Sequence, residues 1–473
     1  MFLDTALDKV PPIRRIRRSR NTTWAMSSLF LFIDTFVYSL TVANLPDILQ
    51  TKMHISSSNN GLISSMFGIG VIIGSLVSAF LSDHFRVRRL VQLLAGVVYT
   101  VAGIVFFEAD HYYQMLIFKV INGIASGVAC TMLYTTVGDV FSANLLGFIV
   151  AIIYLCNNIS YSIGPICGQK LYELNGVKGI ASLVIALGLL EIVLLLTIVE
   201  DSLVQKESVP HSHELAIRSG TLPELNEGGS QSSQSLSKIP TDSLSVKDSN
   251  GYAKDNGESI PIWKLLLQPP VVVSAIAIIT FIGIQCTLEG LIPLHLKDKL
   301  HHSDDSGVTF VAFGVATIIS VPFVGKINDW MIKRYGESVR YILIAVGSVF
   351  LFLFTLLMAL AQRYSVMMVG YVLLAFAISC VFVPAQSAFG DFINYMGSDS
   401  MAQSFAISNM SWAIGAIALP PIGTGLYSSA GFGNTMIGIS AIASFICIVA
   451  CVAILIYNRK ADHKSNNPGV SLH

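Results

Sequence analysis

The chain has 473 residues, with 29 acidic and 29 basic side chains, so its net charge of zero gives no reason to expect a nucleic-acid partner. Hydrophobic residues make up 53% and charged residues 12%, and that charged fraction is about half the value usual for a soluble domain. All seven cysteines fall inside apolar runs, which excludes a disulfide framework and shows no metal-ligand spacing. We therefore expect a polytopic membrane protein without a cofactor.

Twelve apolar runs follow one another along the chain, each long enough to cross a bilayer as a helix of about 20 residues. The runs lie near 24–46, 60–82, 90–108, 114–136, 146–169 and 178–199, then near 268–292, 307–328, 340–361, 365–389, 402–425 and 435–457. They are continuous rather than short and alternating, which excludes a β-barrel. The sequence predicts an all-α membrane protein of twelve transmembrane helices in two pseudo-symmetric six-helix bundles.

The predicted organisation has five parts: a basic N-terminal tail at 1–23, a first bundle at 24–200, a linker at 201–264, a second bundle at 265–457 and a tail at 458–473. The linker is rich in Ser, Gly and charged residues and has too few apolar side chains to fold, so we interpret it as a disordered tether. Its serines leave regulatory phosphorylation open.

Basic residues predict the orientation. Leaving the linker aside, fifteen Lys and Arg residues fall on the side that holds both termini, against six on the other side. Because basic loops stay in the cytoplasm, we expect both termini there, in the plasma membrane or a vacuolar or vesicular membrane.

Four pairs of positions indicate an internal duplication, because they recur in the same order at similar offsets. They are Asp34 and Glu289, Asp83 and Asp329, Gly138-Asp139 and Gly390-Asp391, and Pro165 and Pro420, at offsets of 255, 246, 252 and 255 residues. Repeated halves that meet at a site near the middle of the bilayer are typical of secondary transporters.

Three formally charged residues stand out deep inside the apolar runs: Asp34, Lys119 and Glu289. A charge at that depth costs about 2.5–3.5 kcal/mol or more, and is tolerated mainly beside a cavity or a partner. For Asp34, the sequence leaves open a proton carrier, a counter-ion for a cation, or a structural pair with Lys119. Glu289 has no evident basic partner, so we expect either a direct role in proton or solute binding or an interhelical hydrogen bond. Lys119 is expected to give electrostatic support.

Polar residues at helical spacing accompany these charges. The predicted stripes are Asp34, Tyr38 and Thr41, then Lys119, Asn122 and Ser126, then Gln285 and Glu289. We expect all three stripes to face one central pathway. Ser379 and Asn409 offer neutral hydrogen-bonding groups in the second half, either to the pathway or as contacts between helices.

Two further motifs predict structural or gating roles. The loop Asp83-His84-Phe85-Arg86-Val87-Arg88-Arg89 places an acid at a helix end beside three arginines, either as charge-assisted hydrogen bonds between helix ends or as ordinary positive-inside charge. Asp329 occupies the equivalent place in the second half. Gly164, Pro165 and Gly168 permit close packing and bending in the fifth run.

The chain has no Walker A, GxSxG, HExxH or CxxC motif, so hydrolysis of ATP and other enzymatic activities are not expected. Transport energy would then come from an ion gradient, in which one charge crossing 100 mV releases about 2.3 kcal/mol.

These features resemble the major facilitator superfamily, and the GPxxG motif resembles that of its drug:proton antiporters. The 83–89 loop is similar to the signature between helices 2 and 3, although Ala79 and Arg86 stand where glycines are usual. Lys119-x-x-Asn122-Gly123 resembles the helix 4 motif with Lys in place of Arg.

A closer likeness is to vesicular amine transporters, in the segments SIGPICGQKLYE and FAISNMSWAIGAIALP and in the spacing of Asp34 to Pro46 and of Glu289 to Pro293. Met66 stands where that family has a Lys, and Ser379 and Asn409 stand where it has acids. If the chain is an antiporter, Asp34 and Glu289 must then carry most of the coupling.

The resemblance implies a monomeric, proton-coupled antiporter or exporter of small cationic or amphiphilic, amine- or drug-like solutes. Its implied partners are the solute, protons and the lipid bilayer. Two alternatives stay open: a uniporter or symporter of a neutral solute, and a sensor on the same scaffold that transports nothing.

Overall fold

The computed structural model describes residues 17, 19–55, 59–85, 88–141, 143–197, 267–302, 305–396 and 401–466. The predicted linker at 201–264 lies outside the described residues, as do most of the two predicted tails. The last helix continues beyond the expected end of the second bundle at 457, to Asn466.

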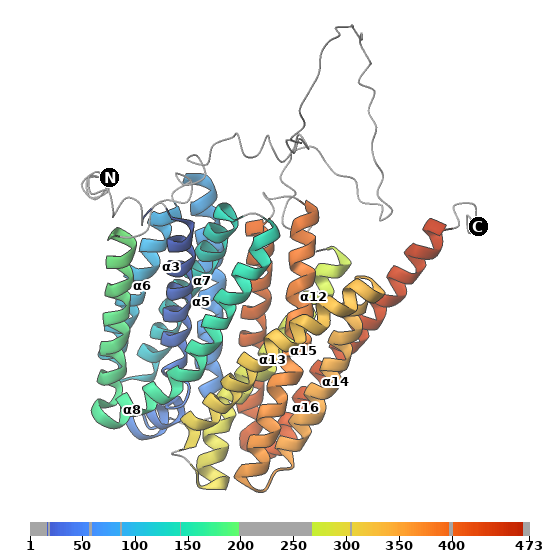
Figure 1. Cartoon of the computed structure of the whole chain (residues 1–473). Coiled ribbons are helices and arrows are strands. Elements are labelled where there is room, and N and C mark those ends of the chain that lie inside the picture. The colour runs from blue at the N-terminus through green and yellow to red at the C-terminus, as the bar shows by residue number, and fades with distance from the viewer. Residues whose placement is uncertain are drawn as a thin grey trace, which may run out of the picture.

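Helices account for all the regular structure of the described residues (Figure 1). In the first half they are α3 (Arg20–Ser39), α4 (Leu45–Asp47), the π-helix η1 (Ile48–Lys52), α5 (Asn60–Phe85), α6 (Arg88–Phe107), α7 (Tyr112–Val140) and α8 (Ala143–Thr197). In the second half they are α12 (Pro269–His295), the π-helix η3 (Leu296–Leu300), α13 (Ser306–Tyr335), α14 (Val339–Ala359), α15 (Tyr364–Met396) and α16 (Met401–Asn466).

Two of these helices are hairpins of two segments each. The backbone leaves helical geometry at Gly176 in α8, where φ is 61°, and at Gly431 in α16, where φ is 74°. Both dihedrals lie in the left-handed region that glycine enters without steric cost. Figure 1 shows the chain turning back at each point.

The described part of the chain contains nine helices that are long and apolar enough to cross a membrane. Two of the nine are the hairpins, which adds two segments, and α3 is a further membrane-length helix whose polar side chains lower its hydropathy. The twelve predicted transmembrane helices are therefore confirmed, six in each half.

The first helix ends earlier than the predicted run at 24–46. It stops at Ser39, and residues 40–44 form turns before α4. Pro46 supplies the physical reason, since it has no N–H to donate and its ring would clash with the carbonyl of residue 42 in a continuous helix. Thr41 therefore does not extend a helical stripe from Asp34.

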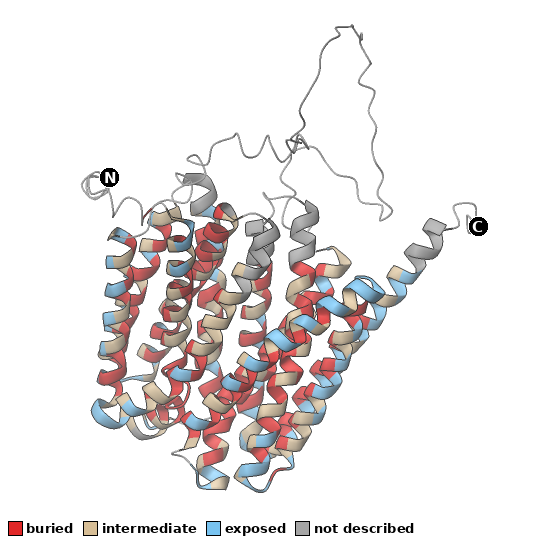
Figure 2. Ribbon diagram, viewed as in Figure 1, coloured by how far each residue is buried: buried red, intermediate tan, exposed pale blue. Residues whose placement is uncertain are grey.

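Buried apolar side chains form two large clusters. One contains residues of the first half, from Phe30 to Leu195, and the other is built mainly from the second half, from Val271 to Ile454. Figure 2 shows the buried positions on the inner helix faces and exposed positions on the outer ones. The outer faces carry large apolar side chains such as Phe80 and Phe445, each 67% exposed, as expected for contact with lipid.

The two halves meet along α5 with α16 and along α8 with α13. We call the end at which α3 and α12 begin the proximal end, and the opposite end the distal end. Near the distal end, a Cβ at Gly61 would lie 2.3 Å from the carbonyl oxygen of Pro420, so the two backbones touch. The amide of Gly307 also donates to Gln169 Oε1, at 3.2 Å, across the same interface.

Candidate functional site

Glu289 is the acid of the second half that faces the first half. It lies on α12 and is 5% exposed. Its Oε2 accepts a hydrogen bond from the hydroxyl of Tyr38 at 2.5 Å, and its Oε1 accepts one from the hydroxyl of Tyr161 at 2.6 Å. Both tyrosines come from the first half, on α3 and α8, so this carboxyl group joins the halves at the centre of the protein.

Gln285 lies one turn before Glu289 on α12 and donates its Nε2 to Oε1 at 3.4 Å. The predicted shared face of these two residues is thus present. Gln285 is the contact that Glu289 makes within its own helix, and it orients the carboxyl toward the tyrosines.

Lys119 lies on α7 and is 3% exposed. Its Nζ donates to Thr41 Oγ1 at 2.7 Å and lies 5.3 Å from the ring centroid of Tyr38. Tyr38 therefore contacts both charges, with its ring facing the ammonium group and its hydroxyl bonded to Glu289. A cation over an aromatic face gains about 0.5–2 kcal/mol.

A small cavity, about 20 Å³ in volume, connects these groups. Lys119 and Glu289 line it together with Tyr38, Thr41, Val42, Leu45, Asn60, Ser64 and Gly290. That volume is about the size of one water molecule, while pockets for organic ligands measure about 300–1,000 Å³. The cavity is thus far smaller than an organic solute in this conformation.

Asp34 lies in a different environment. It is 6% exposed and accepts hydrogen bonds from the hydroxyl of Tyr99 and from Cys130 Sγ, the latter at 3.5 Å. Both partners belong to the first half, on α6 and α7. Asp34 does not line the central cavity, so the structure does not bring the two acids together.

The alternative of an ion pair between Asp34 and Lys119 is wrong for this conformation, because no such pair exists among the described residues. Glu289 also has no ion-pair partner among the described residues, and its hydrogen bonds go to neutral groups. Lys119 shares its cavity and interacts with it electrostatically across Tyr38, beyond ion-pair distance.

Glu191 is a buried acid that the sequence analysis overlooked, although it is visible in the apolar run at 178–199. It is 2% exposed, and its Oε2 has no hydrogen-bond partner in the described part of the chain. It interacts electrostatically with Asp34 and Tyr99. The first half therefore contains two buried acids away from the central cavity.

The remaining predicted polar residues are scattered. Asn122 is buried, and neither amide atom has a partner among the described residues. Ser379 is buried in the second half, with its Oγ 2.6 Å from that of Ser320, and Asn409 is half-buried with no partner for its Nδ2 among those residues. The structure does not place Ser379 or Asn409 against the cavity.

The loop motif is partly visible. Arg86 and the side chain of Asp83 lie outside what the structure describes. Arg89 donates from Nε and Nη2 to the carbonyl oxygens of Leu195 and Leu196, at 2.9 and 2.7 Å, so it caps the end of α8. Arg88 is half-buried, and the equivalent acid of the second half, Asp329, is exposed.

The GPxxG motif lies where α8 packs on α3. A Cβ at Gly164 would meet the side chain of Ser39, and one at Gly168 would lie 1.9 Å from the carbonyl oxygen of Leu40. Pro165 lies between them in α8, while the backbone break is at Gly176. The glycines thus bring α8, which carries Tyr161, close to α3, which carries Tyr38.

At the distal end, α4 and η1 (residues 45–52) form a segment that we call the distal strap. Lys297 of η3 donates to Asp47 Oδ1 at 2.6 Å and to Gln50 Oε1 at 3.0 Å, which ties the strap to the second half. The strap is also attached to the first half, through its own residue Lys52.

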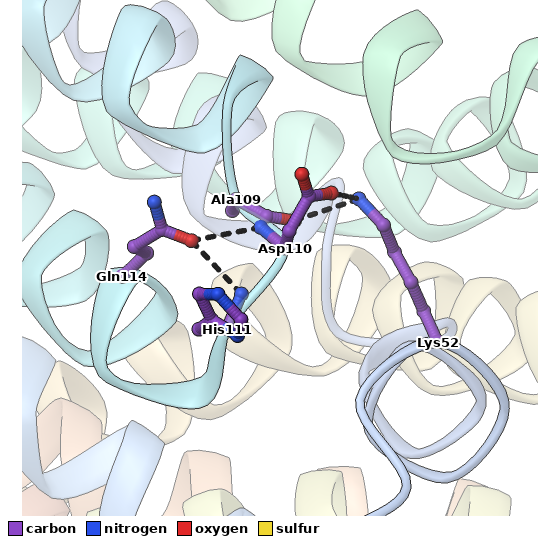
Figure 3. A network of polar contacts seen from close by, with 5 residues as sticks. All are labelled: Lys52, Ala109, Asp110, His111 and Gln114. Atoms are coloured by element: carbon purple, nitrogen blue, oxygen red, sulfur yellow. Dashed lines mark hydrogen bonds and ion pairs between the residues drawn. The ribbon is translucent and has the colours of Figure 1, made fainter.

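Figure 3 shows this second attachment, in which Lys52 Nζ lies 2.9 Å from Asp110 Oδ1 and donates to the carbonyl of Ala109 at 2.6 Å. Gln114 fixes the same loop, because its Oε1 accepts from the amides of Asp110 and His111, at 2.8 Å each. The hydrogen bond and positive charge from Lys52 lower the pKa of Asp110.

Comparison with known proteins identifies the family. A profile described as the Major Facilitator Superfamily matches residues 27–408. The hexose transporter HXT13 of Saccharomyces cerevisiae is 30% identical over 128 residues, which cover 26% of this chain and 22% of that protein. The MFS-type transporter ppzB of Metarhizium majus is 21% identical over 331 residues, which cover 65% of this chain and 69% of that protein. The match to HXT13 thus spans less than a quarter of that yeast transporter.

Solved structures share the fold over most of the chain. The human organic anion transporter MFSD10 (TETRAN) has a TM-score of 0.62 and 15% identity, covering 93% of this chain and all of that one. A POT family transporter in complex with a thioalcohol-conjugated peptide has a TM-score of 0.64 and 16% identity, covering 93% and 96%. At these identities the likeness shows the fold alone.

Proposed function

We propose that this chain, which belongs to the Major Facilitator Superfamily and is a membrane transporter, exchanges protons for small organic solutes. The proposed solutes carry a positive charge or are amphiphilic, as amines and many drugs are. This assignment places the chain near the drug:proton antiporters and their vesicular amine relatives. In this proposal the chain operates as a monomer by alternating access, with both termini in the cytoplasm.

The observation that carries the proposal is the bonding of Glu289. The carboxyl group belongs to the second half, and two of its hydrogen-bond donors belong to the first. An ionised carboxylate accepts from both tyrosines at once. When it binds a proton, one oxygen becomes a donor and a weaker acceptor, so the hydrogen bond from a tyrosine to that oxygen is weakened or reversed. The protonation state of Glu289 is thereby linked to how the halves are held together.

The same carboxylate supports exchange rather than co-transport. A positively charged group of the solute and a proton both neutralise Glu289, so binding of one weakens binding of the other. Release of the proton to one side prepares the site for the solute, and a new proton displaces that solute on the opposite side. The closed distal end in this structure is the barrier that must open for one of these steps.

The test is uptake of cationic compounds into proteoliposomes with an imposed pH gradient. Glu289→Gln keeps the shape of the side chain but removes its charge and replaces one of the two acceptor oxygens by an NH2 donor. We expect gradient-driven transport to fall to background while insertion and folding persist. Glu173→Gln, at an exposed position paired with Lys170, is the matched control. Normal coupling in Glu289→Gln would remove this residue from the mechanism.

Asp34→Asn is the companion variant, since Asp34 is also proposed to bind protons but lies outside the cavity. Loss of transport in both variants supports two proton sites. Loss in Glu289→Gln alone assigns coupling to the central carboxyl group. If the protein is a uniporter of a neutral solute, collapse of the pH gradient should leave solute uptake by both variants unchanged. If it is a sensor, no solute should move at all.

A further inference from the structure

We infer that the solute bound at the central cavity is a zwitterion, whose positive group faces Glu289 and whose negative group faces Lys119. This inference rests on the proposed function, because it names the class of solute for the same site. It adds a second recognition element, supplied by the first half of the protein, to the carboxyl group supplied by the second.

The first observation is that Lys119 is a buried charge whose contacts do not neutralise it. Its ammonium group donates to the neutral hydroxyl of Thr41 and lies over the rings of Tyr38 and Phe118, at 5.3 and 5.6 Å from their centroids. No carboxylate among the described residues lies within 4.0 Å of it. A charge buried in a membrane protein without an ion-pair partner is costly, and such residues mark ligand pathways.

The second observation is the arrangement of the two charges around one space. Lys119 and Glu289 line the same cavity from opposite halves. Tyr38 holds them apart, because its hydroxyl is bonded to Glu289 while its ring faces the ammonium group. The cavity therefore has one positive and one negative side, and neither side is satisfied by the other.

Charge complementarity then selects the ligand. A simple cation beside Glu289 would bring a second positive charge close to Lys119, and a simple anion beside Lys119 would be repelled by Glu289. A molecule with an ammonium group and a carboxylate places an opposite charge against each residue. It also compensates both buried charges at once, which neither of the simpler ions does.

Neutral groups at the cavity fit the same ligand. Asn60 donates its Nδ2 to the carbonyl of Gly290 at 3.0 Å, while its Oδ1 is buried and has no hydrogen-bond partner among the described residues. That free oxygen can accept a hydrogen bond from an ammonium group on the side of Glu289. The cavity of about 20 Å³ must widen to admit such a solute, as expected when a conformational change precedes binding.

The test uses three matched compounds for each of alanine, leucine and phenylalanine: the free amino acid, its methyl ester and its N-acetyl form. The three forms share a side chain but are zwitterionic, cationic and anionic, respectively. Transport is measured in proteoliposomes with an imposed pH gradient, against protein-free liposomes as the reference for passive entry. We expect the amino acid to be preferred over both derivatives by about tenfold or more, the factor that 1.4 kcal/mol produces.

Lys119→Met retains the length of the side chain and removes its charge. We expect it to abolish the preference, with transport of the amino acid falling about tenfold while that of the ester is retained or rises. Lys119→Arg should keep the preference. Lys170→Met, at an exposed lysine paired with Glu173, is the control and should behave as the wild type.

The outcomes separate this inference from the proposed function. Gradient-driven transport of the ester but not of the amino acid would overturn the zwitterion and leave proton exchange standing. The same holds for an unchanged preference in Lys119→Met. Absence of gradient-driven transport of every compound by folded wild-type protein would contradict both. If Lys119→Met does not fold, thermal stabilisation of the wild type by the three forms decides, and equal shifts for ester and amino acid overturn the inference.

Discussion

At the scale of single residues, Asp34 and Glu289 show what helical periodicity leaves undetermined. Both were expected to face inward, and both are buried. A buried face, however, has different neighbours on its two sides. Asp34 faces α6 and α7 of its own half, while Tyr38, four residues later, faces Glu289 in the other half. Only the packed structure shows which neighbour each side chain meets.

Asp110 gives the residue-scale prediction, since it lies in a loop between two membrane-spanning helices. The pKa of Asp110 is lowered by Lys52. Pairing with Lys52 therefore stabilises the folded loop at pH values above the usual pKa of an aspartate. This contribution is lost as the pH falls through the lowered pKa. We expect the protection factors of amide hydrogen exchange in residues 109–114, which are corrected for the intrinsic pH dependence of exchange, to fall over that acidic range.

The matched variant for this prediction is Asp110→Asn. Its amides in residues 109–114 should have low protection factors at neutral pH, and these factors should change little in acid. High salt should also reduce the difference between the two proteins, because Asp110 is 73% exposed and its charge is screened. Wild-type protection factors in residues 109–114 that do not vary with pH would contradict the role of the pair.

At the scale of elements, the sequence predicted the start of each helix to within a few residues, because the apolar runs are long and their ends are polar. It did not predict that the first helix stops at Ser39. It also did not predict the two π-helices η1 and η3. They begin at Ile48 and Leu296, an offset of 248 residues.

This offset differs from that of one predicted pair of equivalent positions. It agrees with the 246 residues between Asp83 and Asp329 in the neighbouring helices, whereas Asp34 and Glu289 are 255 residues apart. With an offset of 248, the residue equivalent to Glu289 is Thr41, which lines the same cavity. Asp34 and Glu289 in fact lie in different environments, one within the first half and the other between the halves.

The contact between α3 and α8 gives the element-scale prediction. Gly168→Ala places a methyl group 1.9 Å from the backbone oxygen of Leu40, which cannot move aside as a flexible side chain can. We expect a loss of about 1–3 kcal/mol or more in stability from overpacking, seen as a lower thermal unfolding temperature in detergent.

Gly425→Ala is the control for this change, because nothing lies within 4 Å of a Cβ at that position in α16. It should leave stability unchanged or raise it slightly, since alanine favours a helix by about 0.5–1 kcal/mol. Equal effects of the two substitutions would show that the helix contact is not tight.

At the scale of the whole molecule, the contacts between halves decide which side of the membrane reaches the central site. None of these pairings was predicted, because they join residues between 128 and 352 positions apart that share no motif. The pair of Lys297 and Asp47 is the most accessible of them, at 35% and 40% exposure. Such pairs contribute about 0–1 kcal/mol, which is enough to bias two conformations of similar energy.

We expect Lys297→Asp to favour opening of the distal end, because it places a negative charge on η3 against Asp47 of the distal strap. The double variant Lys297→Asp with Asp47→Lys should restore closure. The measurement is modification of a cysteine introduced at Ser64, which lines the cavity, by an impermeant thiol reagent added from the distal side. A change of 1 kcal/mol corresponds to about a fivefold change in rate, and failure of the double variant to restore protection would contradict the assignment.

The two glycine turns of the hairpins have a mechanical consequence. A reversal at a single residue, Gly176 or Gly431, leaves no slack for one arm of the hairpin to slide past the other. In α8, the inner arm is the segment before Gly176 and the outer arm is the segment after it. When the inner arm tilts during a transport cycle, the outer arm must tilt with it as a rigid body. A spectroscopic label at Leu189, which is 50% exposed on the outer arm of α8, would thus report the swing of Tyr161 on the inner arm without disturbing the cavity.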